Sequence, residues 1–256
     1  MKTNFHTHCK RCGHAFGKEE DYVKAALKKN LVQLGFSDHA PFPNFDFGNR
    51  MPFSELPEYL ATIDRLKEKY DIEIFKGLEI EYHPMYTFYY KELFKDYHID
   101  YLVLGEHFYT RPNGIIENIY FAESTEDYLV YAKAICQGIE SGFFAFVAHP
   151  DLMFINAFPW DKNCQKASEM IIKCARKNES ILEFNANGYR RKKFPFPDGE
   201  RYPYPHMKFW EMVRDTELRV IIGSDCHEPN QIFDDKVELA YKTADSLGLN
   251  VIDTIF

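Results

Sequence analysis

Histidines and carboxylates recur in short patterns that suit metal binding along this chain of 256 residues. His6 and His8 are separated by one residue, and His14 follows after a short turn. Residues two apart in a strand point to the same side, so His6 and His8 can share a metal ion. Glu79 and Glu81 share a face by the same rule. One carboxylate can bridge two metal ions about 3.5–4 Å apart, a separation that activates water against a phosphoryl group. These patterns predict a metal site suited to phosphate-ester chemistry.

The segments that must position these residues alternate between short apolar runs and longer amphipathic ones. The apolar runs predict strands at residues 3–5, 33–37, 73–80, 101–104, 144–148, 181–184 and 219–222. The amphipathic runs predict helices at residues 19–30, 54–70, 85–97, 124–142, 163–178, 207–215 and 231–247. Ser124 and Gly142 are typical start and stop residues for one of these helices. This alternation predicts parallel β/α units, in a barrel or an open sheet.

The metal-type residues all follow or close a predicted strand. They are His6 and His8 after the first strand, His39 after the second, Glu79 in the third, His107 after the fourth, His149 after the fifth, and Asp225 with His227 after the seventh. The C-terminal strand ends of a β/α barrel converge on one rim, whereas an open sheet would scatter them along its edge. The sequence therefore favours a barrel. We expect no metal role for His83, His98 and His206, which lie outside this pattern.

Composition excludes several classes of protein. The chain has 31 basic and 39 acidic residues and a net charge of −8, which argues against a nucleic-acid partner held by bulk positive charge. No apolar run approaches the roughly 18 residues of a membrane helix, and the first residues lack the apolar region of a signal peptide. Six cysteines in a chain of this length do not indicate a disulfide framework. We therefore expect a cytoplasmic protein with no membrane partner, and a single domain over residues 1–256 because no repeat or linker interrupts it.

In their order along the chain, these patterns resemble the polymerase and histidinol phosphatase (PHP) superfamily. The resemblance rests on His6-Thr7-His8, His14, Ser37-Asp38-His39, Gly77-Leu78-Glu79, His107, His149-Pro150 and Gly223-Ser224-Asp225-Cys226-His227. It implies an α/β fold, namely a distorted (β/α)7 TIM-like barrel with three divalent metal ions at the C-terminal rim. The implied ligands are His6, His8, Glu79 and Asp225 for the first ion, Glu79, His107 and His149 for the second, and His14, His39 and His227 for the third. Such ligands suit Zn, Mn or Fe and do not choose among them.

Within the superfamily, the sequence is most similar to the histidinol-phosphate phosphatases. The matching segments include Gly35-Phe36-Ser37-Asp38-His39-Ala40-Pro41, His149-Pro150-Asp151-Leu152, and Glu183-Phe184-Asn185 with Gly188-Tyr189-Arg190. This similarity implies hydrolysis of L-histidinol phosphate to L-histidinol and phosphate, a step of histidine biosynthesis. Two positions depart from the pattern. Residues 152–155 are apolar where we expect a basic residue, and Glu106 is acidic where we expect a small or apolar one.

The implied reaction assigns further roles. Glu79, Asp225 and His227 are the catalytic candidates, and Asp225, His227 or a water molecule could protonate the leaving group. Arg190 is the first choice for binding the small-molecule phosphate ester, because a guanidinium group can bind two of its oxygens at once, and Arg50 is the second choice. Glu81, Glu106 and Asp46 are candidates for the amine and imidazole of the substrate.

Two other functions stay open at this point. The same metal site could hydrolyse a nucleotide, a sugar phosphate or a phosphotyrosine peptide. A non-catalytic metal-binding accessory domain is disfavoured, because all nine ligand positions of the pattern are filled. The pair Cys9 and Cys12 lacks the helix-opening context of a redox motif, so we expect it to be incidental.

Overall fold

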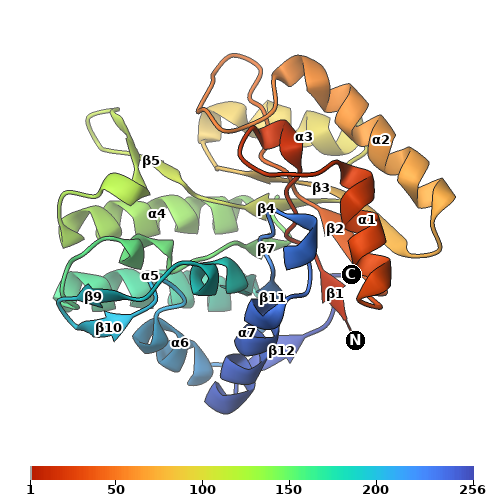
Figure 1. Cartoon of the computed structure of the whole chain (residues 1–256). Helices are drawn as coiled ribbons and strands as arrows, with labels where there is room; N and C mark the ends of the chain where they lie inside the picture. Colours follow the sequence, from red (N-terminus) through yellow and green to blue (C-terminus); the bar gives the residue numbers. More distant parts are fainter. Residues whose placement is uncertain (1) are drawn as a thin grey trace.

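Eight parallel strands curl around a common centre in the computed structural model of the chain, which describes residues 2–256 (Figure 1). The sheet has the order β1-β2-β3-β4-β7-β8-β11-β12. Its strands are β1 (Thr3–Asn4), β2 (Gln33–Phe36), β3 (Glu73–Ile80), β4 (Tyr101–Leu104), β7 (Phe146–Val147), β8 (Ile181–Asn185), β11 (Arg219–Gly223) and β12 (Asn250–Ile252). The first seven are the predicted strands, so the distorted β/α barrel is confirmed. The three-residue β12 is too short to show in the apolar pattern.

Backbone hydrogen bonds close the barrel at its C-terminal rim. Thr7 and Cys226 form a parallel bridge just beyond β1 and β11, and the His8 N–H donates to the Cys226 carbonyl at 3.1 Å. At the opposite end of the barrel, β12 pairs with the start of β11 through Asn250 and Arg219. The rim is therefore fixed where the metal-type residues leave their strands.

Seven helices connect the strands and lie outside the sheet. They are α1 (Glu19–Lys28), α2 (Leu56–Lys69), α3 (Thr87–Lys95), α4 (Thr125–Ser141), α5 (Lys162–Lys177), α6 (Met207–Arg214) and α7 (Asp235–Leu247). Figure 1 shows α1, α2 and α3 on one flank of the barrel and α4, α5 and α6 on the opposite flank. As predicted, Ser124 caps α4 and Gly142, at φ 72°, ends it. The helix predicted from residue 231 begins later, because the Asp234 side chain accepts hydrogen bonds from the N–H groups of Lys236 and Val237.

Two antiparallel hairpins extend from the rim and were not indicated by the sequence. One joins β5 (Phe108–Thr110) to β6 (Ile116–Asn118), and the other joins β9 (Phe194–Phe196) to β10 (Gly199–Arg201). Their strands are three residues long, so they carry almost no periodicity. Both hairpins stand beside the opening of the barrel.

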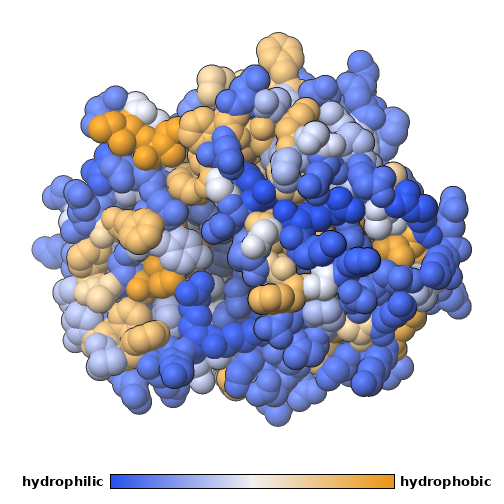
Figure 2. Space-filling model, turned by 45° about the horizontal axis from the view of Figure 1, so that its top comes forward, coloured by the Kyte–Doolittle hydropathy of each residue, from blue (hydrophilic) through white to orange (hydrophobic). Residues whose placement is uncertain are grey.

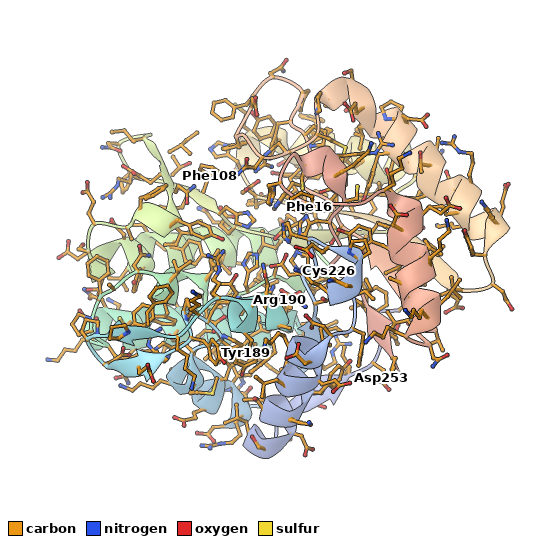
Figure 3. All side chains as sticks on the ribbon, in the orientation of Figure 1. Phe16, Phe108, Tyr189, Arg190, Cys226 and Asp253 are labelled. Atoms are coloured by element: carbon orange, nitrogen blue, oxygen red, sulfur yellow. The ribbon has the colours of Figure 1, made fainter. Side chains whose placement is uncertain are left out.

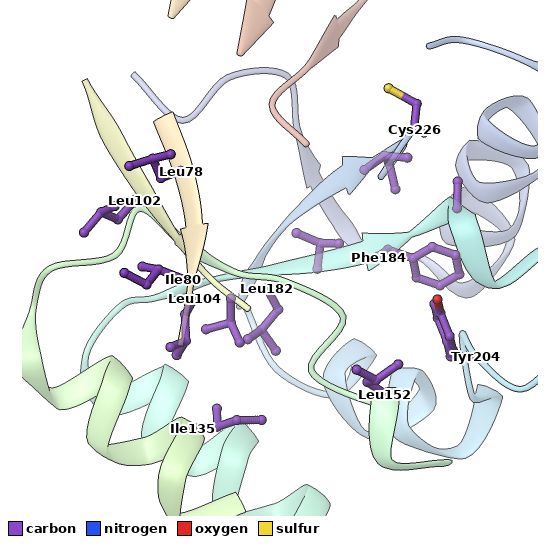
Figure 4. Close-up of a cluster of buried hydrophobic side chains, with 14 of the residues drawn as sticks. Leu78, Ile80, Leu102, Leu104, Ile135, Leu152, Leu182, Phe184, Tyr204 and Cys226 are labelled. Carbon is purple, nitrogen blue, oxygen red and sulfur yellow. The ribbon is translucent and has the colours of Figure 1, made fainter. Parts of the chain in front are cut away.

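The hydrophobic core has an outer layer between sheet and helices. Figure 4 shows Leu78, Leu102 and Leu104 of β3 and β4 on the same side of the sheet as Ile135 of α4. A Cβ at Gly138 would lie 2.6 Å from a methyl carbon of Leu104, so only glycine lets α4 approach β4 this closely.

A second layer fills the inside of the barrel. It consists of Phe5, Tyr101, Val103, Phe146, Ala148, Ile181 and Ile221. The C-terminal Phe256 stacks on Phe75 below it, with ring centroids 4.3 Å apart. The His6 ring packs against Phe146, so this layer lies directly beneath the histidines and carboxylates of the rim. Across residues 2–256, no helix is long and apolar enough to cross a bilayer.

Candidate metal centre

The predicted ligands meet at the C-terminal rim around Glu79, a buried residue of β3. His149 Nε2 lies 2.9 Å from Glu79 Oε1, and His39 Nδ1 lies 2.9 Å from Glu79 Oε2. His6, His8 and His107 place their Nε2 atoms 3.5, 3.5 and 3.7 Å from a Glu79 oxygen. One carboxylate is thus shared by five imidazoles that leave four different strands.

The other predicted ligands join this group from its edges. Asp225 Oδ1 lies 3.2 Å from His8 Nε2 and 3.7 Å from His6 Nε2. His227 Nε2 lies 2.9 Å from His14 Nε2, and its ring stacks on that of His8. All nine predicted ligand residues are therefore brought together.

The donor groups overlap with the three sets that the resemblance implied, and they differ from them in part. His6, His8 and Asp225 form one compact group, as implied for the first ion. His39 groups with Glu79 and His107 as well as with His8 and His227. Among residues 2–256, His14 belongs to no compact group of three; it lies 2.9 Å from His227 through the two Nε2 atoms, and its ring stacks on that of His39.

Two ligands sit on strained backbone. His149 and Asp225 have φ angles of 30° and 47°, in the left-handed region that residues other than glycine seldom adopt. Such a conformation costs about 1–3 kcal/mol and persists only where surrounding contacts hold it. The His149 N–H donates to Glu183 Oε2 at 3.0 Å, and the side-chain amides of Asn185 and Asn187 donate to Asp225 Oδ2 at 3.2 and 3.0 Å.

Three further carboxylates orient the ligands from behind. Glu183 Oε1 lies 2.7 Å from His6 Nδ1, Asp38 Oδ1 lies 3.3 Å from His8 Nδ1, and Glu81 Oε1 lies 3.1 Å from His107 Nδ1. A carboxylate in this place fixes the imidazole tautomer and leaves Nε2 for a metal ion. Sequence reasoning assigned no role to Glu183. The sequence feature that could have indicated a role for Glu183 is its position as an acidic residue in the middle of the buried run Ile-Leu-Glu-Phe-Asn of β8.

The electrostatics and the unpaired atoms of the site both fit bound cations. His6 Nε2 and His8 Nε2 are buried without a hydrogen-bond partner in the described chain. Burial alone would raise the pKa of Glu79, but the neighbouring imidazoles His6, His107 and His39 outweigh it and hold that pKa well below its usual value. Burial and the nearby His8 charge lower the pKa of His39 to about 3. Burial lowers the pKa of His6 and of His8, but the surrounding carboxylates outweigh it, raising the pKa of His6 and bringing that of His8 to about 9. Divalent metals bind neutral imidazoles, so metal binding would displace these protons.

We expect Glu183→Gln to weaken zinc binding about 10- to 100-fold, because the amide cannot hold His6 as the carboxylate does. Competition with a chromophoric chelator measures this affinity. Glu179→Gln makes the same chemical change on the exposed turn before β8 and should leave zinc affinity unchanged. Equal affinities in the two variants would remove Glu183 from the support of the centre.

A cavity of about 720 Å³ opens above the metal-type residues. Figure 2 shows a hollow near the middle of this face, with hydrophobic side chains at its edge toward the β5–β6 hairpin. Its lining includes His39, Glu79, His107, Asp225 and His227 from the metal-type residues, together with Phe47, Arg50, Phe108, Asn118, Tyr120, Phe121, Ile155, Asn187, Arg190, Arg191 and Gln231. The cavity thus combines metal ligands, aromatic side chains and three arginines.

The two arginines predicted to bind phosphate are already engaged within the protein. Arg190 donates to both oxygens of Asp234 at 3.0 Å, to Ser224 Oγ and to the Gln231 carbonyl, each also at 3.0 Å. It lies beside Cys226 at the end of the sheet in Figure 3. Arg50 binds both oxygens of Glu81 at 3.0 and 3.1 Å. Both guanidinium groups therefore make structural contacts while they also line the metal cavity, and their binding of phosphate stays a prediction.

We expect Arg190→Ala to lower the free energy of unfolding by about 3 kcal/mol, since it leaves the partly buried Asp234 without its cation. Urea denaturation of the zinc-loaded protein measures this loss. The control is Arg214→Ala, which removes an exposed ion pair with Asp215 and should cost under about 1 kcal/mol. Normal stability combined with a large rise in KM would instead place Arg190 on the substrate.

Arg191 is the arginine that remains for a ligand. Its guanidinium lies 5.8 Å from the ring centroid of Tyr120 and 5.7 Å from that of Tyr204. No carboxylate in the described residues forms an ion pair with it. Arg190 is the last residue of a short 3-10 helix (Ala186–Arg190), and Arg191 follows it with extended backbone at φ −76° and ψ 148°, so the two neighbouring side chains take different directions.

The three acidic residues that we expected to bind the amine and imidazole of the substrate do not line the metal cavity. Glu81 is buried between Arg50 and His107. Glu106 is buried and lines a different cavity. Asp46 is exposed and accepts a hydrogen bond from the Gly48 N–H. None of the three is among the residues that line the metal cavity.

Fold and site together define a β/α barrel with a candidate divalent-metal site at its C-terminal rim. The family model for the PHP domain matches residues 4–187, more than two thirds of the chain. The chain therefore belongs to the PHP domain family, as its motifs indicated. That the domain extends over residues 1–256 stays a prediction.

Similar proteins carry related names. A probable histidinol-phosphatase of Deinococcus radiodurans is 28% identical over 237 residues, covering 89% of this chain and 86% of the relative. The putative histidinol phosphatase of Listeria monocytogenes has the same fold, with a TM-score of 0.75, 22% identity and coverage of 94% and 99% of the two chains. The histidinol phosphate phosphatase of Lactococcus lactis was solved with zinc, L-histidinol and phosphate. It superimposes with a TM-score of 0.68 and 17% identity, covering 98% of this chain and 95% of the Lactococcus chain.

Proposed function

We propose that this chain is a metal-dependent phosphoric monoester hydrolase that converts L-histidinol phosphate to L-histidinol and phosphate, as a cytoplasmic enzyme of histidine biosynthesis. The observation that carries the proposal is the meeting of Glu79 with the eight other predicted ligands, seven histidines and Asp225, beneath a cavity that Arg191 lines. The names of the similar proteins support the choice of substrate.

The donor set suits three divalent ions, and we assign them to the residues of the sequence pattern. His6, His8, Glu79 and Asp225 would hold the first ion, Glu79, His107 and His149 the second, and His14, His39 and His227 the third. When bound, such ions supply Lewis acidity that activates water and offsets the charge of a phosphoryl group. Nitrogen and oxygen ligands suit Zn, Mn or Fe, and zinc is the ion bound in the similar Lactococcus protein.

The chain's own residues would bind and orient the ester. The Arg191 guanidinium carries N–H donors that match two phosphate oxygens. The side-chain amides of Asn187 and Gln231 lie in the same wall of the cavity. Asp225 is held by Asn185 and Asn187, so it stays fixed while the phosphate binds beside it. Asp225 and His227 remain the proposed catalytic side chains at this wall, together with Glu79.

The aromatic side of the cavity would receive the organic part of the substrate. Phe47, Phe108, Tyr120 and Phe121 line the same cavity as Arg191 and Asn187, and Tyr120 lies under the Arg191 guanidinium. The Tyr120 ring is nearly parallel to the His107 ring, with centroids 6.5 Å apart. Flat aromatic surfaces of this kind stack on a planar ring such as imidazole.

Phosphate release from a panel of esters tests the choice of substrate. The zinc-loaded protein is assayed on L-histidinol phosphate beside nucleotide, sugar and aryl phosphates. We expect kcat/KM of at least about 10⁴ M⁻¹s⁻¹ for L-histidinol phosphate, well above the other esters. Preference for another ester would keep the metal-dependent hydrolase and reject this substrate. No hydrolysis by protein with its metals bound would favour an accessory metal-binding domain.

A further inference from the structure

A second cavity, of about 480 Å³, lies between α4, the β5–β6 hairpin and the turn that follows β3. Its walls are mainly apolar, with Phe42, Tyr82, Tyr86, Val130 and Ala134 among them. Phe45, Met85 and Ile116 also line it and leave 44%, 69% and 43% of their surfaces exposed. Figure 2 shows hydrophobic side chains gathered over the hairpin on this side of the central hollow. The volume is that of a site for a small organic molecule.

One carboxyl group is buried in this apolar lining. Glu106 is 2% exposed, and its Oε2 accepts a hydrogen bond from the Tyr82 N–H at 3.0 Å. No cation forms an ion pair with it in residues 2–256, and Glu81, which lines the same cavity, is also a carboxylate. The wall of the cavity therefore presents a buried carboxyl group to a ligand that can donate a hydrogen bond.

The position of Glu106 separates it from the metal centre. Its neighbour His107 lines the metal cavity, whereas Glu106 lines only the second one. Glu81 stands between the two cavities, holding Arg50 and His107 on one side while lining the apolar cavity on the other. Glu106 therefore has no part in the metal chemistry, although it adjoins a ligand in the sequence.

We propose that the second cavity is a ligand site for a small primary amine with an apolar body. The amine donates its N–H groups to the Glu106 carboxyl, and the apolar body packs against Tyr86, Val130 and Ala134. Phe45, Met85 and Ile116 form the opening through which the ligand enters. A hydrogen bond between an ammonium and a carboxyl group is stronger than one from a neutral hydroxyl, so an amine is preferred to an alcohol of the same shape.

The test uses the zinc-loaded full chain with carbon-13 labels on its methionine and isoleucine methyl groups. The probe is 3-phenylpropylamine, and its matched control is 3-phenylpropan-1-ol. We expect saturable shifts at Met85 and Ile116, no shift at Ile155 of the metal cavity, and at least tenfold weaker binding of the alcohol. Shifts centred on Ile155, or no saturable binding of the amine, would overturn the proposal.

Two variants assign the interaction to its residues. Glu106→Gln keeps the size of the side chain and an acceptor for the Tyr82 N–H, and we expect tenfold weaker amine binding with alcohol binding unchanged. Ala134→Phe fills the cavity and should abolish binding of both probes. Should Glu106→Gln fail to fold, undiminished binding to Ala134→Phe overturns the site by itself. Because the readout is binding, the result is independent of which ester the metal centre hydrolyses.

Discussion

Glu79→Gln is expected to lower kcat for phosphate release by at least about 10³-fold, the equivalent of several kcal/mol of transition-state stabilisation. Glu79 is the carboxylate around which five imidazoles gather, within 2.9–3.7 Å of its oxygens. The glutamine amide has nearly the same shape, but it lacks the charge and offers one acceptor oxygen in place of two. The variant should therefore also bind fewer zinc ions, which elemental analysis of the dialysed protein measures.

The matched control is Glu73→Gln, at the exposed start of the same strand β3. Its activity and zinc content should equal those of the unmodified chain. A Glu79→Gln protein that keeps both full zinc content and full kcat would show that the centre does not depend on this carboxylate.

Arg191→Ala is expected to lower kcat/KM about 10²- to 10³-fold, the usual effect of removing one preorganised donor from a developing charge. Arg191 is the arginine of the cavity without a carboxylate partner among residues 2–256, and it lies between Tyr120 and Tyr204. Its removal takes away the donors that we assign to the phosphate and leaves the metal ligands in place. Zinc content should therefore stay unchanged while steady-state phosphate release falls.

Lys192→Ala removes a positive charge from the next, exposed position of the same loop and should change kcat/KM by less than a factor of two or so. Arg191→Lys tests the geometry of the contact, because an ammonium cannot bind two oxygens in one plane and should restore only part of the loss. A large loss in Lys192→Ala, or none in Arg191→Ala, would contradict the assignment.

The metal centre could be predicted from the sequence because its ligands stand at the ends of strands. In a barrel the strand order alone brings such positions to one rim, so His6, Glu79 and Asp225 meet although they are far apart in the chain. The grouping of ligands is less predictable. His39 approaches Glu79 because the backbone beyond β2 pairs with β3 once more, in a parallel bridge between these two residues, which no periodicity encodes.

The substrate side of the site was harder to predict, because it depends on side-chain direction in irregular segments. Arg190 and Arg191 are neighbours in sequence, and only the fold shows that Asp234 holds the first. Glu106 likewise points away from the metal cavity although His107 faces it. The sequence shows Glu183 only as an acid within an apolar strand, and the fold is needed to show that it pairs with His6.

The most direct test of the account is phosphate release from L-histidinol phosphate by chelator-treated protein, before and after zinc is added back. We predict negligible activity without metal, and activity that returns in step with zinc bound to the protein. Full hydrolysis by the metal-free chain would contradict the central claim that the residues around Glu79 act by holding metal ions.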